Sequence, residues 1–502
     1  MTYDVVVVGS GGGALVGALL AQKAGLRTVV LERTNYVGGT SAYSGGACWL
    51  PGSEVQQRAG ISDSTEGARS YLGAILEGAS EAKVEAFLAE APRLVRALEA
   101  DPAFEFEWLP FPEYYDAPGR VPSGRSIQPT NIKRSDLPEE VGALVRPPVE
   151  RDRVGEGGRN TLSGGQALIA RTLNAFIREG GTVLTNHRVT GYVVDGDKVA
   201  GVKAETEQGE VEIPAARAII TAAGGFEGNE ALRKQYAVPG SAEATMAPRG
   251  TNAGEAIEAA LEIGAAIAHM TEGWFCPGLE QPDGGGSFTL GFRGGVMVDQ
   301  AGNRYANECL PYDRFGREMA KADNRIPSYF IFDSREGGRL PAIAMPEGDP
   351  AEHLAAGTWV KADSLAELAE AVGLANLEQT VATFNQYAES GVDADFARGS
   401  DEYDTFFAFG GGDPNKALVP IDTAPYYAAR FVLSDLGTKG GLVTDEHGRV
   451  LREDGSVITG LYATGNSSAS MFGPIYPGPG APLGSAMVFA SLAIKSILGE
   501  QS

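Results

Sequence analysis

The sequence predicts an α/β fold, and two observations near its start support this. Residues 3–8 form a short run of apolar, mostly β-branched residues, and a glycine-rich turn and a helical pattern over 15–24 follow it. A second apolar run, 28–31, ends at Glu32, close to the ~20-residue offset at which an acidic residue meets a ribose hydroxyl. Strand, turn, helix and strand in this order predict a Rossmann-type unit that binds a dinucleotide.

The turn after the first run reads Gly9-Ser10-Gly11-Gly12-Gly13-Ala14. Glycines suit this place because the backbone must approach a pyrophosphate closely, while the N-terminus of the next helix offers unpaired N–H groups. A flexible loop without a ligand is the alternative. Strand, helix and Glu32 all lie where the binding interpretation needs them, and NAD and FAD both remain open at this point.

Composition and charge exclude several classes of function. The net charge of −24, from 41 basic and 65 acidic residues, opposes binding to nucleic acid and to anionic lipid. No apolar run approaches the ~18 residues that span a bilayer, and the start lacks the pattern of a signal peptide, so we expect a cytoplasmic protein without a membrane span. The three cysteines are widely spaced and the four histidines lack metal-ligand spacing, so no metal site is expected.

Further along the chain, a helix is predicted over 166–179. Three strand-like runs at 182–185, 189–195 and 198–205 then predict a β-meander attached to the nucleotide-binding domain.

From residue 274 the composition shifts to aromatic, proline-rich and glycine-rich stretches, with helical patterns at 364–372 and 377–390. A chain of 502 residues exceeds the size at which one core usually stops growing. We therefore expect the nucleotide-binding domain to comprise 1–273 and 437–502, interrupted by an inserted α+β substrate (catalytic) domain at 274–436.

Three further segments resemble the fumarate reductase and succinate dehydrogenase flavoprotein superfamily. Segment 38–46 resembles the Gly-Gly-x-Ser/Thr stretch that runs beside FAD there. Segment 218–226 is similar to the strand and glycine turn that return the chain to the nucleotide domain, and segment 460–466 to the turn that places a polar residue on the ribityl chain. The resemblance implies FAD. Covalent members attach it to a histidine of the glycine-rich region, and the first histidine here is His187, so non-covalent binding is expected.

Motif and resemblance together assign twenty residues to the cofactor site: Gly9, Gly11, Gly12, Gly13, Ala14, Glu32, Arg33, Gly39, Thr40, Ser41, Ser44, Gly45, Gly46, Val189, Ala223, Gly224, Gly465, Asn466, Pro482 and Leu483.

The segment after residue 466 separates two classes of substrate. In the dicarboxylate enzymes it contains a His-Gly pair and an Arg-Leu-Gly-Gly run, which supply partners for two carboxylates. This chain has Phe472 and Tyr476 in that region instead. An apolar ring and a phenol favour an uncharged substrate with a carbonyl group.

Residues 476–484 resemble the C-terminal signature of 3-ketosteroid Δ1-dehydrogenases. The resemblance implies that the Tyr476 hydroxyl and the Gly480 N–H bind the C3 carbonyl of a steroid. Two donors aimed at that oxygen would stabilise enolate character and acidify the C2 hydrogen. A proline-glycine turn that only closes the last helix is the alternative.

Residues 304–316 resemble the same family, in which a Leu-Pro-Tyr run follows a more general Asn-Glu pair. The resemblance implies that Tyr312 is the base that takes the C2 proton, and that Tyr114 assists it, with Tyr115 as the second choice. A free tyrosine has a pKa of about 10, so such a base needs a donor or a positive charge nearby. Aromatic packing is the alternative role for each ring.

The implied activity is FAD-dependent 1,2-desaturation of 3-ketosteroids in steroid catabolism, in which C2 gives a proton to tyrosine and C1 gives a hydride to flavin N5. An electron acceptor must reoxidise the flavin, and no motif identifies it. Two alternatives stay open: a flavin-dependent dehydrogenase or reductase of another enone, such as a Δ4-ketosteroid or a non-steroidal cyclic ketone, and a non-catalytic FAD- or NAD-binding regulatory protein.

Overall fold

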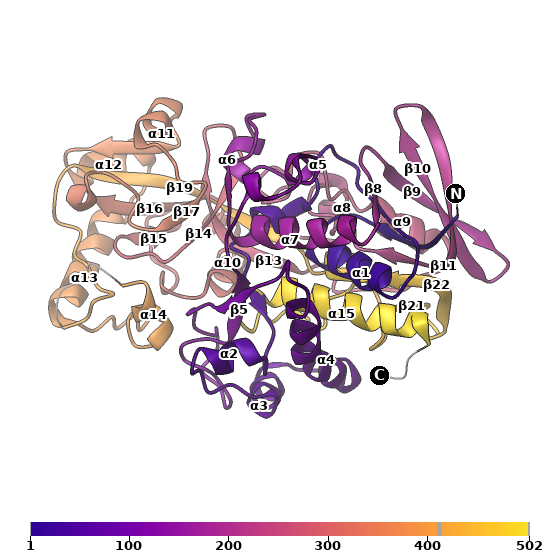
Figure 1. Cartoon of the computed structure of the whole chain (residues 1–502). Coiled ribbons are helices and arrows are strands. Elements are labelled where there is room, and N and C mark those ends of the chain that lie inside the picture. Colours follow the sequence, from indigo (N-terminus) through magenta and orange to yellow (C-terminus); the bar gives the residue numbers. More distant parts are fainter. Residues whose placement is uncertain (1, 409–413, 500–502) are drawn as a thin grey trace. The chain divides into compact units, whose positions relative to one another are not determined.

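The computed structural model describes residues 2–408 and 414–499, and the chain divides into two compact units (Figure 1). The first unit comprises Met1–Tyr236, Ala247–Gly273 and Gly437–Ser502, and the second comprises Ala237–Met246 and Trp274–Leu436. Each unit contains its own large sheet, and the cofactor motifs all belong to the first.

An eight-stranded sheet forms the centre of the first unit, in the order β21-β22-β10-β11-β1-β2-β8, with β9 beside β10. Its strands are β1 (Tyr3–Val8), β2 (Thr28–Leu31), β8 (Thr182–Leu184), β9 (Arg188–Asp195), β10 (Lys198–Thr206), β11 (Gly209–Thr221), β21 (Arg449–Leu451) and β22 (Val457–Ala463). Four parallel pairings join β8 to β2, β2 to β1, β1 to β11 and β11 to β22. The parallel strand β2 is buried along its whole length, which explains its unbroken apolar sequence.

The antiparallel part of this sheet differs from the prediction for 182–185. That run forms β8, which pairs in parallel with β2, so its assignment to the meander is wrong. The meander instead consists of β9, β10 and β11 in consecutive antiparallel pairs. Strand β11 serves both parts, because its first half pairs with β10 and its second half with β1. A short apolar run carries no information about which strand it will pair with.

Three helices pack together in the first unit: α1 (Gly12–Lys23), α7 (Gly164–Arg178) and α15 (Ala481–Leu498). Figure 1 shows the yellow α15 alongside α1. Close approach depends on small residues, since a Cβ on Gly13 would lie 2.8 Å from the carbonyl oxygen of Ala486. The glycine-rich turn after β1 and the C-terminal helix are therefore held together.

Helix α15 is the helix that bears on the expectation of a chain without a membrane span. Among the described residues it is the one helix long and apolar enough, at 18 residues, to cross a membrane by length and composition. However, 61% of this helix is buried within the protein, as is typical of a core helix.

The remaining helices of the first unit are α2 (Glu54–Arg58), α3 (Thr65–Ile75), α4 (Glu81–Glu99), α5 (Glu139–Leu144), α6 (Val149–Asp152), α8 (Glu230–Gln235) and α9 (Glu255–Glu262). A three-stranded sheet contains β3 (Cys48–Trp49), β5 (Ser126–Pro129) and β4 (Phe106–Trp108), and two short pairs join β6 (Ile132–Lys133) to β7 (Thr161–Leu162) and β12 (Ile267–Ala268) to β20 (Gly441–Leu442).

The second unit has a seven-stranded sheet in the order β15-β16-β19-β13-β14-β17, with β18 beside β19. Its strands are β13 (Gly273–Glu280), β14 (Gly286–Leu290), β15 (Val296–Val298), β16 (Ser328–Asp333), β17 (Ile343–Met345), β18 (Trp359–Ala362) and β19 (Tyr426–Thr438). Its helices are α10 (Tyr312–Ala320), α11 (Pro350–Ala356), α12 (Leu365–Val372), α13 (Leu377–Ser390) and α14 (Glu402–Phe406). Helices α12 and α13 correspond to the two helices predicted in this part of the chain, and they share a hydrophobic core with β15 and β16.

Candidate active site

The glycine-rich turn that the sequence assigns to phosphate binding begins where β1 ends. Gly9 has φ +95°, and a Cβ there would overlap the Ala222 carbonyl and lie 2.7 Å from the Cα of Ala223. Gly12 at the start of α1 donates its N–H to the Ser41 hydroxyl at 3.1 Å. The first N–H groups of a helix have no acceptor within the helix, so this turn can receive a pyrophosphate.

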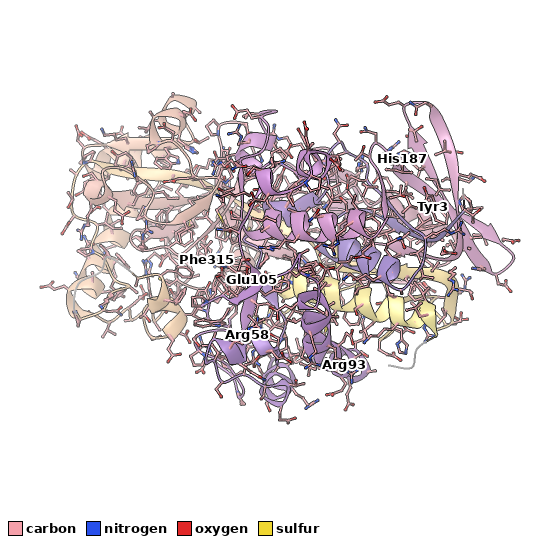
Figure 2. The ribbon with its side chains drawn as sticks, viewed as in Figure 1. Tyr3, Arg58, Arg93, Glu105, His187 and Phe315 are labelled. Carbon is pink, nitrogen blue, oxygen red and sulfur yellow. The ribbon has the colours of Figure 1, made fainter. Side chains whose placement is uncertain are left out.

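Glu32 lies at the end of β2 and is buried beside the turn. Its carboxylate accepts hydrogen bonds from the Ser10 hydroxyl at 2.5 Å and from the N–H and hydroxyl of Thr34, each at 2.8 Å. The N–H of His187, which is labelled in Figure 2, donates to the Glu32 carbonyl at 2.9 Å and brings the start of β9, with the predicted Val189, to this end of the sheet. Its neighbour Arg33 instead forms an ion pair with Glu255 at 3.1 Å.

Arg146 is a residue of this region that the sequence did not suggest. It is 3% exposed, and its guanidinium donates to the Thr34 hydroxyl at 2.6 Å and to Asp152 at 2.7 Å. Thr34 in turn donates to Glu32, so Arg146 supports the carboxylate through one intermediary. No local pattern could reveal it, because more than a hundred residues separate the partners.

Segment 38–46 lies against the N-terminus of α7. The Gly165 N–H donates to the Ser44 carbonyl at 2.9 Å, and the Ser44 hydroxyl donates to the Ser41 carbonyl at 2.8 Å. A Cβ on Gly46 would lie 2.5 Å from the Cα of Gly164, whereas Cβ atoms on Gly39 or Gly45 would meet no atom within 4 Å. Gly46 is therefore required for packing, and the backbone at Gly39 and Gly45 borders open space.

The two distant glycine turns of the cofactor prediction meet because β11 and β22 are parallel neighbours. The Ala223 N–H donates to the Ser467 hydroxyl at 2.9 Å, and that hydroxyl donates to the Gly224 carbonyl at 2.8 Å. Gly465 and Asn466 begin the 3-10 turn that contains Ser467. The structure thus brings together the two segments that the sequence analysis assigned to the same ligand.

Residues at the start of α15 complete the predicted set. Pro482 lies in the first turn of α15 and Leu483 follows it; a Cβ on Gly12 would lie 3.0 Å from a terminal methyl group of Leu483. The C-terminal helix therefore begins next to the glycine-rich turn that contains Gly12.

A buried carboxylate beside the second glycine turn was also missed. Glu227 is fully buried and accepts hydrogen bonds from the N–H and hydroxyl of Thr438, each at 3.2 Å, and from the Asn252 amide. Asn252 also donates to the Thr40 hydroxyl at 3.4 Å. The one available signal was the position of Glu227 two residues after Gly225, in the run Gly224-Gly225-Phe226-Glu227.

The predicted carbonyl-binding loop precedes α15. Tyr476 is 2% exposed, and Gly480 has φ +84°, where a Cβ would lie 2.6 Å from the backbone nitrogen of Cys48. The Gly480 carbonyl accepts from the N–H of Trp49 at 3.0 Å, whereas no atom in the described part of the chain accepts a hydrogen bond from the Gly480 N–H. Gly480 therefore offers an open donor near a buried phenol.

Tyr114 lies beside this loop. Its ring makes an edge-to-face contact with Tyr476, and its N–H donates to the Pro477 carbonyl at 3.2 Å. Tyr115 is only half-buried, and its N–H binds the Tyr71 hydroxyl at 3.2 Å. The ring contact with Tyr476 supports Tyr114 as the first choice of the two candidates.

Side chains from elsewhere in the first unit hold the loop in place. The Tyr71 hydroxyl donates to the Pro477 carbonyl at 2.6 Å, and the Ser126 hydroxyl donates to the Pro479 carbonyl at 2.5 Å. Burial is the main reason why the pKa of Tyr71 lies above its usual value, so Tyr71 stays a hydrogen-bond donor throughout the neutral range.

A buried ionic cluster supports Tyr114 and the loop together. This Arg125 cluster consists of Arg125, Glu113, Asp63 and Trp49, with Arg125 to Glu113 at 2.7 Å and to Asp63 at 2.9 Å, and the Trp49 indole to Glu113 at 2.9 Å. Burial raises the pKa of Glu113, while Arg125 acts in the opposite direction. Removal of one partner would leave an uncompensated buried charge.

Tyr312 belongs to the second unit. It is the first residue of α10 and 5% exposed, and its ring meets Phe288 edge-to-face with centroids 4.7 Å apart. Phe315, labelled in Figure 2, follows on the same helix and packs against Tyr305 at 5.7 Å between centroids.

The segment before Tyr312 is held by a buried ionic group. Glu308 pairs with Arg304 at 2.8 Å and with Arg398 at 3.0 Å, and Asp393 pairs with Arg304 at 2.9 Å. Burial alone would raise the pKa of Glu308, but Arg304 and Arg398 outweigh it and lower that pKa. The Asn-Glu pair of the sequence thus contains the carboxylate that orders the approach to α10.

Comparison with known proteins shows the family to which the chain belongs. Residues 4–483 match the family described as "FAD binding domain". The 3-oxosteroid 1-dehydrogenase of Rhodococcus opacus is 39% identical, over 98% of this chain and 98% of its own. The 4-oxocyclohexanecarboxylate 2-dehydrogenase of Sinomonas cyclohexanicum is 34% identical, over 99% of this chain and 93% of its own.

A solved structure agrees with these matches. The 3-ketosteroid Δ1-dehydrogenase of Sterolibacterium denitrificans, in complex with 1,4-androstadiene-3,17-dione, superposes with a TM-score of 0.91 at 30% identity and covers 99% of both chains. The likeness extends over both units.

Proposed function

We infer the reaction from one premise: the chain belongs to the FAD binding domain family, and within it to the 3-ketosteroid Δ1-dehydrogenases. It is an FAD-dependent oxidoreductase that acts on neighbouring CH groups, and it removes hydrogen from C1 and C2 of a 3-ketosteroid. The androstadienedione held by its relative is the corresponding 1,4-diene product.

The observation that carries the proposal is the loop before α15. It offers the open N–H of Gly480 and the phenol of Tyr476 from one short, buried segment, which the Arg125 cluster and Tyr71 hold in place. Two fixed donors of this kind suit a carbonyl oxygen that gains negative charge.

The residues of the first unit fit FAD. The turn at 9–14 would receive the pyrophosphate, Glu32 the ribose, and segment 38–46 with the turns at Ala223 and Gly465 the remainder of the ligand. When bound, FAD supplies the hydride acceptor at N5. With no histidine in segment 38–46, non-covalent binding is proposed.

Tyrosine side chains carry out most of the steps of the proposed reaction. Tyr476 and Gly480 hold the C3 carbonyl and stabilise the enolate, which acidifies the C2 hydrogen. Tyr312 receives the C2 proton, Tyr114 assists, and hydride leaves C1 so that a C1=C2 double bond forms. Residues 274–436 act as the substrate domain in this proposal, and the enzyme works in the cytoplasm on an uncharged steroid during steroid catabolism.

Product analysis tests the proposal. The purified flavoprotein is incubated with 4-androstene-3,17-dione and an artificial electron acceptor. We expect 1,4-androstadiene-3,17-dione, lighter by two hydrogens. A preparation that stays colourless and gains no flavin absorbance with added FAD would instead support a non-catalytic protein, and a different dehydrogenation product would support another enone substrate.

A second candidate function rests on the similarity to the Sinomonas enzyme, whose name describes a cyclic ketone that bears a carboxylate. The same α,β-desaturation next to a ketone would apply. Measurement of kcat/KM for 4-oxocyclohexanecarboxylate beside the steroid separates the two, and a higher value for the carboxylate would replace the steroid as substrate.

A further inference from the structure

Lys439 places a buried ammonium group beside the carbonyl-binding loop. The residue is 1% exposed, and its Nζ donates to the carbonyl oxygens of Pro474 at 2.9 Å and Ile475 at 3.1 Å. An ammonium group is buried only where hydrogen bonds compensate for its lost hydration. The two acceptors immediately precede Tyr476 in the chain, so the lysine holds the segment that delivers the phenol.

The ammonium also faces Tyr476 itself. Its Nζ lies 5.9 Å from the centroid of the Tyr476 ring, within the range of a cation–π contact. The lysine backbone is fixed at both of its polar groups, since its N–H donates to the Glu272 carbonyl at 2.8 Å and its carbonyl accepts from Ser470 at 3.0 Å. The charge is therefore held in one place relative to the phenol.

The neighbouring titratable residues His269, Lys83 and Glu272 do not supply a second positive charge at this position. The pKa of His269 is lowered from its usual value of 6.5, chiefly by burial and to a smaller extent by Lys83 and Lys439, so the imidazole is neutral at pH 7. Lys83 donates instead to the Thr444 hydroxyl at 2.9 Å and lies over the ring of Phe489. Glu272 acts on His269 in the opposite direction.

We propose that Lys439 is a positioning residue that also stabilises charge: through the carbonyls of Pro474 and Ile475 it fixes the Tyr476 phenol, and its ammonium favours a negatively charged substrate oxygen over a neutral one. In a site from which water is excluded, a fixed positive charge acts more strongly than it would in water. The inference rests on the proposed function, because it requires that Tyr476 meets the oxygen that becomes the enolate.

The test compares a neutral and an ionisable ligand on the FAD-loaded protein. The ketone probe is 4-androstene-3,17-dione, and the phenol probe is estrone, whose A ring carries a hydroxyl in place of the ketone and whose ionised oxygen resembles the enolate. Binding is followed by the change in flavin absorbance at constant pH, and turnover by reduction of an artificial acceptor.

For Lys439→Met we expect kcat to fall about 100-fold, as when one oxyanion-stabilising donor is lost, while KM for the ketone stays within about threefold. Estrone affinity should fall at least about tenfold more than ketone affinity. Lys439→Arg keeps the charge and should recover part of the estrone preference. Lys83→Met is the matched control, since it removes a partly buried ammonium elsewhere in the same unit.

Unchanged kcat in Lys439→Met, or equal losses of ketone and estrone affinity, would overturn the role of the charge. An equal effect of Lys83→Met on the estrone preference would do the same. Retained flavin absorbance and circular dichroism separate these outcomes from misfolding. A wild-type protein that binds neither steroid would overturn the proposed function itself, whatever the variants show.

Discussion

The rings of Tyr114 and Tyr476 meet edge to face, with centroids 5.2 Å apart. They lie far apart in the sequence, and the same loop carbonyl, that of Pro477, accepts from the Tyr114 N–H and from the Tyr71 hydroxyl. Each ring is almost fully buried. The contact makes the position of either phenol depend on the other.

Tyr114→Phe should lower kcat for the steroid by about 10²- to 10³-fold, the range for a group that assists proton transfer. Tyr115→Phe is the matched control, because its ring is half-buried and its neighbour Tyr71 is unchanged. Steady-state kinetics with an artificial acceptor measure both. The reverse order of effects would assign the assisting role to Tyr115.

Tyr476→Phe should reduce kcat/KM for 3-ketosteroids by about 10²-fold or more, because a donor to the developing enolate is lost. The edge-to-face packing on Tyr114 is kept, so the thermal unfolding midpoint should change little. Kinetics equal to those of the wild type would refute the carbonyl-binding role.

Tyr312→Phe should nearly abolish flavin reduction by the steroid, because no other group in the proposal takes the C2 proton. FAD content should stay unchanged, since Tyr312 belongs to the second unit and the cofactor residues to the first. Stopped-flow absorbance of the flavin measures the reductive step alone. Rapid reduction in the variant would show that another base acts.

Glu308→Gln should destabilise the protein by about 3–5 kcal/mol at pH 7, because Arg398 loses its buried carboxylate partner and Arg304 keeps only Asp393. The lowered pKa of Glu308 means that its contribution is complete above the unfolded value of about 4.3 and is lost as pH falls through the folded value. Wild type and variant should therefore converge in acid.

Unfolding midpoints measured from pH 7 down to acid test this pH dependence. Glu336→Gln is the control, because its ion pair with Arg293 is partly exposed and should contribute about 0–1 kcal/mol. A constant difference between wild type and Glu308→Gln at every pH would contradict the ionic explanation.

The parts of the fold that the sequence predicted are those set by neighbours in the chain. The runs that became β1, α1 and β2 carry their own periodicity and glycines, and Glu32 follows at the offset the motif requires. The pairing of β8 with β2 was missed, because hydrogen-bond partners between strands depend on the whole sheet.

The residues of the candidate site also fall into two groups: those that a continuous run of sequence predicts and those that only the folded structure brings together. Tyr476 and Gly480 could be found because one continuous run resembles a family signature. Arg125, Arg146 and Lys439 could not be predicted from isolated charged positions, because their contacts with Asp63, Thr34 and Pro474 join segments that lie tens of residues apart in sequence and form only when the chain folds. The roles of the tyrosines stay predictions that the variants above test.

The central claim is that a 3-ketosteroid passes its hydrogens to the FAD of this protein. Anaerobic titration of the purified flavoprotein with 4-androstene-3,17-dione tests it most directly, with the flavin absorbance as the signal. We predict that the oxidised flavin band bleaches on addition of the steroid. A flavin that stays oxidised at saturating steroid, while a chemical reductant still bleaches it, would contradict the claim.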